Sequence, residues 1–361
     1  MTAIEVALGR PTAALQAPLN IDVATEQDAA AWDGFVLGCP NATGYHEWAW
    51  RRVFQRAFDH QPIYLVARGE RGFEGVLPLV CIDGFLFGRM LTSLPFVNYG
   101  GVLSGSDMVS QALVNAAIDA GVRRRCRLLE LRHLSRRFPN LACKQHKVSM
   151  HLTLGPAMWN RLDRKVRNQI RKAQKSDLTS EQGGAELVKD FYTVFARNMR
   201  DLGTPVYSRR FFDEVLAAFP DRACVTVVRF KSGSKSAPVA AAISYRSRST
   251  TEVPWASSVR EYNSLCPNHL LYWSLIEQAA ASGCKVFDFG RSTPHEGTFK
   301  FKEQWGAVPV PLFWEYWLQP GAAPPDANPS NPKFHLAIAL WKRLPLAVAN
   351  QLGPMIVRSI P

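Results

Sequence analysis

The sequence predicts an α+β fold in which two similar lobes with mixed sheets follow one another and a C-terminal tail ends the chain. A length of 361 residues fits two domains of ordinary size. In the second half, the hydrophobic pattern predicts the order helix, helix, three antiparallel strands, helix, strand, loop and strand. The first half follows a shorter version of this order. We therefore expect an internal duplication, although no repeat is visible at the level of residues.

The first lobe is predicted to span residues 21–155, after a flexible leader at 1–20. Its clearest feature is a pair of strands at 63–68 and 75–82, which flank a polar turn. A helix at 106–120 has a serine at position 104 or 106 as its N-cap. The other predicted elements are helices at 30–37 and 47–58 and strands at 91–94, 128–132 and 150–154.

The second lobe is predicted to span residues 156–318. Pro156 opens a helix at 157–175, because proline suits the first turn of a helix. Gly283 is expected to end the helix at 268–282. The other predicted elements are helices at 187–201 and 208–218 and strands at 224–230, 239–245, 251–255, 286–289 and 309–318. A linker rich in Pro, Ala and Asn at 319–332 leads to an amphipathic tail at 333–361.

The balance of charges favours polyanionic partners. The net charge of +13 suits nucleic acid, pyrophosphate-bearing substrates or anionic lipid, and simple solubility is the alternative. The seven cysteines are scattered and include no C-x-x-C, and no cluster has metal-ligand spacing. We therefore predict no metal site and no disulfide framework. The N-terminus lacks the pattern of a signal peptide and no apolar stretch is long enough to span a bilayer, so we expect a cytoplasmic protein.

The segment 159–175 carries a dense row of positive charge. At 100° per residue its apolar side chains fall on one face and its arginines on the other. Like charges three or four residues apart destabilise a helix by a few tenths of a kcal/mol per pair, so a bound anion would stabilise the row. We expect this face to bind phosphate or pyrophosphate; the alternative is a solvated outer face. Its expected ligands are Arg164, Lys165, Arg167 and Arg171.

The segment 286–306 brings together candidate catalytic residues. Its strand ends in Asp288 and Arg291, and loops at strand ends commonly carry chemistry. Strand-like alternation over 299–302 would point Lys300 and Lys302 to the same side. A cation here, from Lys302 or Arg291, could stabilise developing negative charge, and Asp288 could orient an amine or accept its proton. A backbone carbonyl or a water could also take that proton. The alternative is a structural Asp–Arg pair.

In the first lobe, Asn98 and Tyr99 precede two glycines, where the backbone allows close approach. We expect these two residues to line an acceptor cleft between the lobes. The alternative is a tight turn with a packed tyrosine.

Several motifs taken together resemble the Fem-related proteins of the GNAT superfamily, and more closely the FemAB-related subgroup associated with exosortase/PEP-CTERM systems. The resemblance covers roughly residues 45–358. Its motifs are the basic helix, Asn198…Gly203-Thr204-Pro205-Val206-Tyr207, Phe287-Asp288-Phe289-Gly290-Arg291-Ser292, Phe301-Lys302…Trp305-Gly306, Leu94-Pro95-Phe96…Tyr99-Gly100-Gly101, Asn331-Pro332-Lys333 and Trp341-Lys342-Arg343-Leu344-Pro345-Leu346.

This resemblance implies two GNAT-like lobes and a transferase that forms an amide on a cell-envelope or exopolysaccharide precursor. The family's cationic lysine near the reaction centre would be Lys302, with Asp288 as its catalytic partner. Thr204, Tyr207 and Trp305 would contribute to substrate binding, and Arg291 and Lys300 to phosphate binding. The acceptor would be a lipid-linked or nucleotide-linked glycan or peptide.

The acyl donor stays open among aminoacyl-tRNA, acyl-CoA and acyl carrier protein. The coiled-coil arm common in tRNA-dependent Fem proteins is absent, and so is the usual coenzyme A loop. No tightly bound cofactor is expected. A coenzyme A- or carrier-dependent N-acyltransferase is one alternative, and a non-catalytic protein that binds anionic glycolipid or RNA is another.

The tail at 333–361 combines apolar residues with flanking basic ones. Such a segment suits the headgroup region of an anionic membrane, which would place the protein at the inner face of the cytoplasmic membrane. The alternative is a tail packed on the second lobe. The sequence gives no indication of the oligomeric state.

Overall fold

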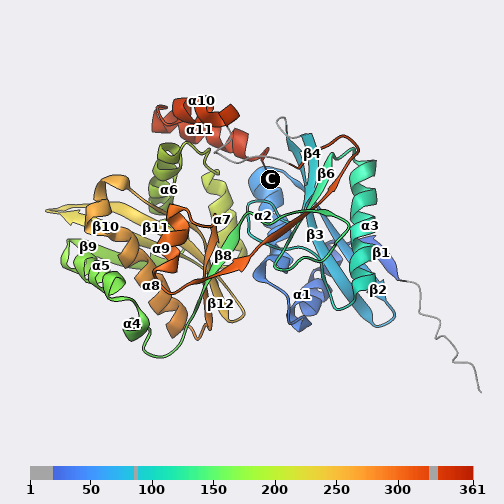
Figure 1. The fold of residues 1–361 in the computed structure, drawn as a ribbon, viewed down its shortest axis with the longest axis horizontal. Coiled ribbons are helices and arrows are strands. Elements are labelled where there is room, and N and C mark those ends of the chain that lie inside the picture. The colour runs from blue at the N-terminus through green and yellow to red at the C-terminus, as the bar shows by residue number, and fades with distance from the viewer. Residues whose placement is uncertain (1–18, 85–87, 325–331, 361) are drawn as a thin grey trace, which may run out of the picture.

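The computed structural model describes residues 19–84, 88–324 and 332–360, so the predicted leader lies almost wholly outside the described residues. Two lobes lie side by side, each built on a mixed sheet with helices on both faces (Figure 1). The two helices of the tail lie across one end of the molecule. The predicted α+β class with two tandem lobes is confirmed.

The first sheet has the order β1-β2-β3-β4-β6-β15-β7, with β5 paired to β3. One of its faces is covered by α3, which buries Val109 and Leu113, and the opposite face by α1 and α2. Ser106 caps α3 as predicted. The bounds are β1 Asn20–Val23, β2 Gln61–Gly69, β3 Gly72–Gly84, β4 Gly88–Thr92, β5 Leu103–Ser104, β6 Leu128–His133, β7 Ala142–Lys144, β15 Phe313–Leu318, α1 Ala29–Gly38, α2 Ala49–Phe58 and α3 Asp107–Arg123.

The second sheet has the order β14-β8-β13-β12-β11-β10-β9. Alternation along β11 sends Ala241 and Ile243 to the face covered by α6 and α7, and Ala240 and Ala242 to the face covered by α8. The bounds are β8 Val148–Thr153, β9 Leu178–Gly183, β10 Ala223–Ser232, β11 Lys235–Ser247, β12 Thr250–Ser258, β13 Val286–Ser292, β14 Val308–Pro311, α4 Met158–Arg161, α5 Arg164–Lys175, α6 Val188–Leu202, α7 Arg209–Ala218, α8 Pro267–Ala281 and α9 Gly297–Glu303.

Two strands cross the boundary that the sequence predicts between the lobes. The strand β8 precedes position 155 but lies inside the second sheet, between β14 and β13. The predicted strand at 309–318 is two strands: β14 pairs with β8, and β15 crosses over to lie between β6 and β7. Proline lacks a backbone donor and is confined to sheet edges, so Pro309 and Pro311 fit the edge strand β14 but not a continuous central strand. Each lobe therefore completes the other's sheet.

Two predicted elements differ from the structure in shape. The helix predicted at 157–175 breaks at Leu162, which is extended, and restarts at Arg164 because the Asp163 carboxylate accepts the Lys165 amide at 2.6 Å. The segment 299–302 is part of the helix α9 rather than a strand.

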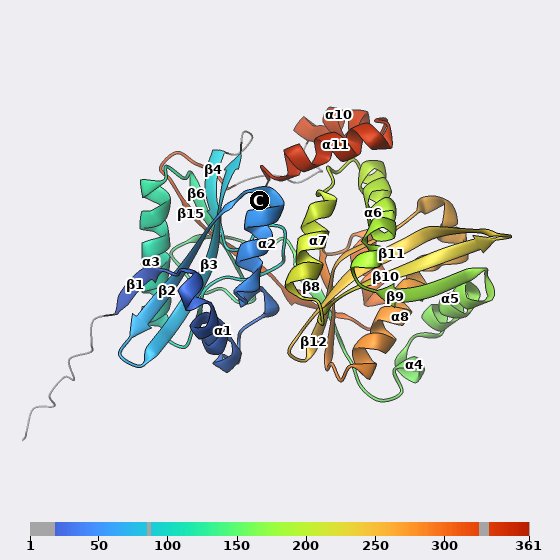
Figure 2. The same cartoon turned by 180° about the vertical axis from the view of Figure 1, so that it is seen from behind.

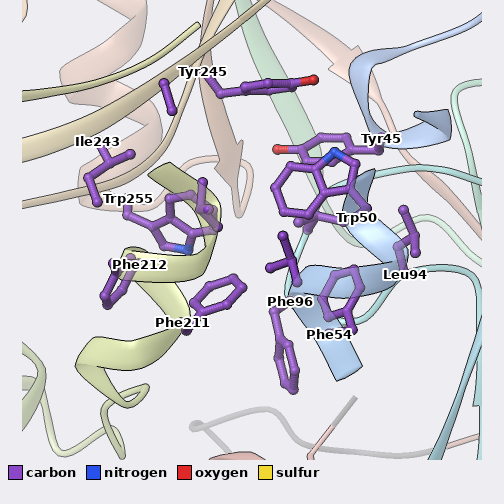
Figure 3. Packing of buried hydrophobic residues seen from close by; sticks show 14 of the residues in the cluster. Tyr45, Trp50, Phe54, Leu94, Phe96, Phe211, Phe212, Ile243, Tyr245 and Trp255 are labelled. Atoms are coloured by element: carbon purple, nitrogen blue, oxygen red, sulfur yellow. The ribbon is translucent and has the colours of Figure 1, made fainter. Parts of the chain in front are cut away.

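One hydrophobic cluster runs through both lobes without a break. Figure 3 shows Trp50, Phe54 and Phe96 of the first lobe facing the aromatic residues of α7 and β12. The Phe58 and Phe211 rings lie 5.0 Å apart, and the Trp50 and Phe219 rings 5.1 Å apart. Such continuous packing holds the lobes in one arrangement.

Polar contacts join the same two lobes beside this cluster. Arg222 of the second lobe donates two hydrogen bonds to the Glu47 carboxylate, at 2.9 and 2.6 Å. Tyr245 donates to Glu47 as well, at 2.8 Å. These partly buried charge-assisted bonds fix the orientation of the lobes.

The tail forms α10 (Pro332–Trp341) and α11 (Leu346–Val357). The helix α11 packs on α6, and Gly353 lies so close to Val206 that a Cβ there would be 2.8 Å from its backbone nitrogen. Near the end of the chain, the Ser359 carbonyl approaches Gly84 of the first lobe. None of the helices in the described residues combines the length and hydropathy needed to cross a bilayer. The tail thus packs on the protein as the alternative proposed, while much of its outer face remains exposed.

Candidate active site

Three ionisable side chains form a row across adjacent strands of the second sheet. Glu252 of β12 pairs with Asp288 of β13, which pairs in turn with His151 of β8. Because residues in register point to the same face of a sheet, the three side chains lie together. This face meets the first lobe, which adds Asn98 and Tyr99.

Asp288 is the centre of the row and is fully buried. Its carboxylate accepts hydrogen bonds from Ser149 Oγ at 2.5 Å, from the Gly290 amide at 2.8 Å and from the Tyr99 hydroxyl. His151 Nε2 lies 3.2 Å from its Oδ2. Burial alone would raise the pKa of Asp288, but the hydrogen bonds and the charge of His151 bring that pKa below its usual value. Asp288 is therefore ionised at neutral pH.

Glu252 behaves in the opposite way. It accepts a hydrogen bond from Asn98 Nδ2 at 2.6 Å, and the Tyr99 hydroxyl lies 3.4 Å from its Oε2. Burial, together with the charge of Asp288, raises the pKa of Glu252 well above its usual value. The pKa values of the two neighbouring carboxyl groups are thus shifted in opposite directions, and negative charge is favoured on Asp288.

Lys302 is bound where the regular pairing of β13 with β12 and β8 is interrupted. The strand pairs with β12 only over 286–288, and its register with β8 shifts between Asp288 and Arg291. Gly290 therefore lies outside both ladders, with a φ of 75° and Val253 O 2.9 Å from where a Cβ would be. Its amide donates to Asp288, and its carbonyl accepts from Lys302 Nζ at 2.9 Å. Lys302 also donates to the Arg291 carbonyl at 3.0 Å.

Burial gives this lysine unusual acidity. Lys302 is 7% exposed, and burial lowers its pKa to about 8. Lys300, two residues earlier on the helix α9, points to solvent. The expectation that both lysines share one side is wrong, because residues two apart on a helix lie on different faces.

A group of basic side chains lies around Trp314 of β15. The guanidinium carbons of Arg132 and Arg291 lie 4.5 and 5.2 Å from its ring centroid. The His146 ring is 5.2 Å away, and Lys147 Nζ donates to Thr293 at 2.5 Å. Burial and the charge of Arg291 lower the pKa of Lys147. We call Arg132, His146, Lys147 and Arg291 the Trp314 cluster.

The basic helix α5 lies elsewhere, on the flank of the second lobe away from the first (Figure 1 and Figure 2). Its apolar face, with Val166, Ile170 and Ala173, is buried as predicted. Arg164, Lys165 and Arg171 are exposed, and Arg167 is half-buried. Burial and, to a smaller extent, the charge of Lys165 lower the pKa of His269 to about 4. The His269 ring lies 5.9 Å from the Trp305 ring.

Other predicted site residues are packed rather than open to a cleft. Asn98 and Tyr99 are buried at the junction of the lobes, and Trp305 is buried in the second-lobe core. Tyr207 lies 5.4 Å from the Phe96 ring and is partly exposed, and Thr204 is half-buried. Two surface hollows lie away from Lys302, one beside Arg52 and Arg210 and one beside Gly184 and Ser282.

Sequence reasoning missed Glu252 and His151. A glutamate inside the apolar strand 250–258 was a usable signal, because a buried carboxyl group needs partners. A single histidine in a strand gives no such signal. Its meaning appears only through the register of β8 against β13.

Comparison with known proteins agrees with this architecture. A family model described as an acetyltransferase (GNAT) domain matches residues 160–303. The crystal structure of FemX aligns with a TM-score of 0.64 at 14% identity, over 82% of this chain and 96% of that one. A tandem GNAT protein from the clavulanic acid biosynthesis pathway aligns with a TM-score of 0.57 at 11% identity, over 86% and 100%.

A third similar structure is the C-terminal domain of a predicted lysylphosphatidylglycerol synthetase from Agrobacterium fabrum. It aligns with a TM-score of 0.55 at 11% identity, over 80% of this chain and 92% of that one. Among curated protein sequences, none matches this chain significantly. At these identities the structures establish the fold alone. The chain thus has the tandem GNAT fold, and its residues 160–303 match the family model of an acetyltransferase (GNAT) domain.

Proposed function

We propose that this protein is an acyl or aminoacyl transferase that forms an amide on a cell-envelope or exopolysaccharide precursor. The observation that carries the proposal is the buried Lys302 ammonium, held at the break in β13. An ammonium group has three donors, and two of them have partners among the described residues. The third can donate to an oxyanion.

The chemistry follows from this donor. An acceptor amine attacks the carbonyl carbon of an ester or thioester, so that a C–N bond forms and the carbonyl oxygen becomes an oxyanion. The C–O or C–S bond then breaks, and the leaving group takes up a proton equivalent to the one that the amine loses. Lys302 stabilises the oxyanion, a contribution that is typically about 10²–10³ in kcat.

The envelope substrate is supported by likeness and by charge. FemX and the lysylphosphatidylglycerol synthetase domain share the fold. The net charge of +13 and the Trp314 cluster suit reactants that carry phosphate. Aminoacyl-tRNA, acyl-CoA and acyl carrier protein each offer a suitable ester or thioester, and lipid-linked or nucleotide-linked precursors offer the acceptor.

The test combines each donor class with lipid-linked and nucleotide-linked acceptors and identifies products by mass spectrometry. We expect wild-type protein to transfer a group to an amine. Lys302→Ala should lower kcat about 10²–10³-fold, while Lys285→Ala, an exposed lysine just before β13, should not. Tight binding of an anionic glycolipid or RNA without turnover would instead favour a non-catalytic binding protein.

A further inference from the structure

We infer that His151, oriented by Asp288, is the general base that takes the proton from the attacking amine. This inference rests on the proposed amide-forming function and adds a catalytic residue to it. The side chain of His151 is 25% exposed, whereas that of Asp288 is fully buried. His151 is thus the member of the Glu252–Asp288–His151 row that a substrate can reach.

The two ring nitrogens of His151 have different surroundings. Nε2 is buried and lies 3.2 Å from Asp288 Oδ2, an ion-pair contact that does not meet the geometry of a hydrogen bond. A proton on the nitrogen nearer that carboxylate leaves Nδ1 with a lone pair, and because Nε2 itself is buried, the 25% exposure belongs to other atoms of the side chain. A neighbouring carboxylate favours the tautomer that carries its proton on the nearer ring nitrogen.

Asp288 itself is poorly placed to take a proton from substrate. Three donors besides His151 already occupy its oxygens: Ser149, Tyr99 and the Gly290 amide. These bonds keep the carboxylate ionised and fixed. In this inference its role is therefore to position His151 and to stabilise the imidazolium that forms.

The surroundings of His151 supply no competing base among the described residues. On one side β13 brings Asp288, and on the other β14 places the apolar Val308 in register with it. The first lobe brings Tyr99, whose pKa burial raises well above its usual value. The helix α9, which contacts β8, brings Lys302 as a cation.

Gly290 contacts both the residue that positions the base and the residue that stabilises the oxyanion. Its amide is bonded to Asp288, and its carbonyl is bonded to Lys302. As the amine nitrogen bonds to the carbonyl carbon, its proton moves to His151 Nδ1 and Lys302 stabilises the oxyanion. When the bond to the leaving oxygen or sulfur breaks, the imidazolium returns that proton to the leaving group.

The experiment compares His151→Gln and His151→Asn with wild type in the transfer assay, with His295→Gln as the control because His295 is an exposed histidine in the loop after β13. Loss of a general base typically costs about 10²–10⁴-fold in rate. We expect both His151 variants to lose at least 100-fold in kcat, to lose the acidic limb of the pH–rate profile, and to regain activity with added imidazole. Asp288→Asn should shift that limb.

The outcomes separate this inference from the proposed function. Suppose that a folded His151 variant keeps the wild-type rate and pH profile while Lys302→Ala loses turnover. His151 would then not be the general base, and the proposed transferase function would still hold. No transfer by wild-type protein with any donor would overturn both. Melting temperatures of the two variants show whether a loss of rate reflects unfolding, and rescue by imidazole supports the inference even if one variant is less stable.

Discussion

Gly290 shows how one residue can decide the geometry of a site. Its positive φ and its place outside both ladders leave an amide and a carbonyl to be satisfied, and Asp288 and Lys302 satisfy them. The sequence predicts that these residue types belong to the site. It does not predict their bonds, because those depend on where the pairing of β13 with β12 ends.

The low pKa of Lys302 predicts a specific dependence of activity on pH. Burial lowers that pKa to about 8, and only the ammonium form brings a positive charge to an oxyanion. We therefore expect kcat to fall as pH rises through about 8. The arginine of Lys302→Arg stays charged in this range, so the kcat of this variant should not fall near pH 8, even if its rate is lower. A pH–rate profile that still falls near 8 in Lys302→Arg would assign the titration to another group.

The same shift predicts a change in stability. Between pH 8 and 10.5 the unfolded chain binds the Lys302 proton and the folded protein does not, so this group makes the free energy of unfolding rise with pH. The rise is at most about 3 kcal/mol. Denaturant unfolding of wild type and Lys302→Ala across this range measures the difference, which should grow with pH. A constant difference would mean that Lys302 titrates normally.

The buried His46 predicts a change in stability at the acidic end of the pH range. Burial lowers its pKa to about 4, and its Nδ1 accepts the Thr43 amide at 3.1 Å. Between pH 6.5 and 4 the unfolded chain binds a proton that the folded protein excludes, so stability falls as pH falls through this window. We expect a loss of up to about 3 kcal/mol for wild type, and a smaller one in His46→Gln. Equal acid sensitivity in the two proteins would contradict the assignment.

At the scale of elements, patterns that concern one helix or hairpin were predictable and those that concern long-range pairing were not. The amphipathic faces of α5 and the hairpin strands β2 and β3 follow from periodicity and turn residues. The crossover of β15 depends on pairing with β6, about 180 residues earlier, for which the local pattern carries no signal. The alternation at 299–302 wrongly predicted a strand, because a pattern of four residues cannot distinguish a strand from a helix.

Two basic surfaces compete as the binding site for phosphate, and they predict different mutant behaviour. In the Trp314 cluster, two guanidinium groups lie against one ring and Lys147 lies nearby, and Arg132 is paired with Glu130, whereas Arg164 and Arg171 of α5 lie on the surface of the second lobe. We expect Lys147→Gln with Arg291→Gln to weaken inhibition of transfer by inorganic pyrophosphate at least tenfold, which corresponds to about 1.4 kcal/mol.

The matched pair Arg164→Gln with Arg171→Gln should change that inhibition less than twofold. A larger effect of the α5 pair than of the Trp314-cluster pair would instead assign phosphate binding to α5. Both double variants remove two positive charges, so the comparison controls for net charge.

The contact of α11 with the second lobe predicts the effect of one methyl group. A Cβ on Gly353 would lie 2.8 Å from the Val206 backbone nitrogen, which a rigid backbone cannot accommodate. We expect Gly353→Ala to destabilise the protein by about 1–3 kcal/mol and to speed hydrogen exchange in α11. Gly34→Ala, in a helix with open space around it, should be neutral or stabilise by about 0.5–1 kcal/mol. Similar melting temperatures for the two variants would mean that α11 is not seated as described.

At the scale of the whole molecule, one face of the tail remains apolar and exposed. Leu336 is 73% exposed and Leu340 57%, with Lys342 and Arg343 exposed beside them. Such a helix suits the headgroup region of an anionic membrane, where each buried leucine contributes about 1.5–3 kcal/mol. We propose that the tail docks the protein beside lipid-linked substrate.

Vesicle co-sedimentation tests this proposal. Wild-type protein should bind phosphatidylglycerol vesicles more tightly than phosphatidylcholine vesicles, and Leu336→Ser with Leu340→Ser should reduce binding at least tenfold. Val122→Ser replaces an exposed apolar residue on α3 and should leave binding unchanged. Unchanged binding of the double variant would remove the tail from membrane attachment.

The strand that passes from one lobe into the other also constrains how this protein can be made. On the ribosome, the chain of the first sheet is complete at Lys144 except for β15, which ends at Leu318. At 5–20 residues per second, the missing strand emerges roughly 10–35 s later. During that interval β6 and β7 lack the partner that separates them, and an early stop codon before position 308 would leave both sheets incomplete.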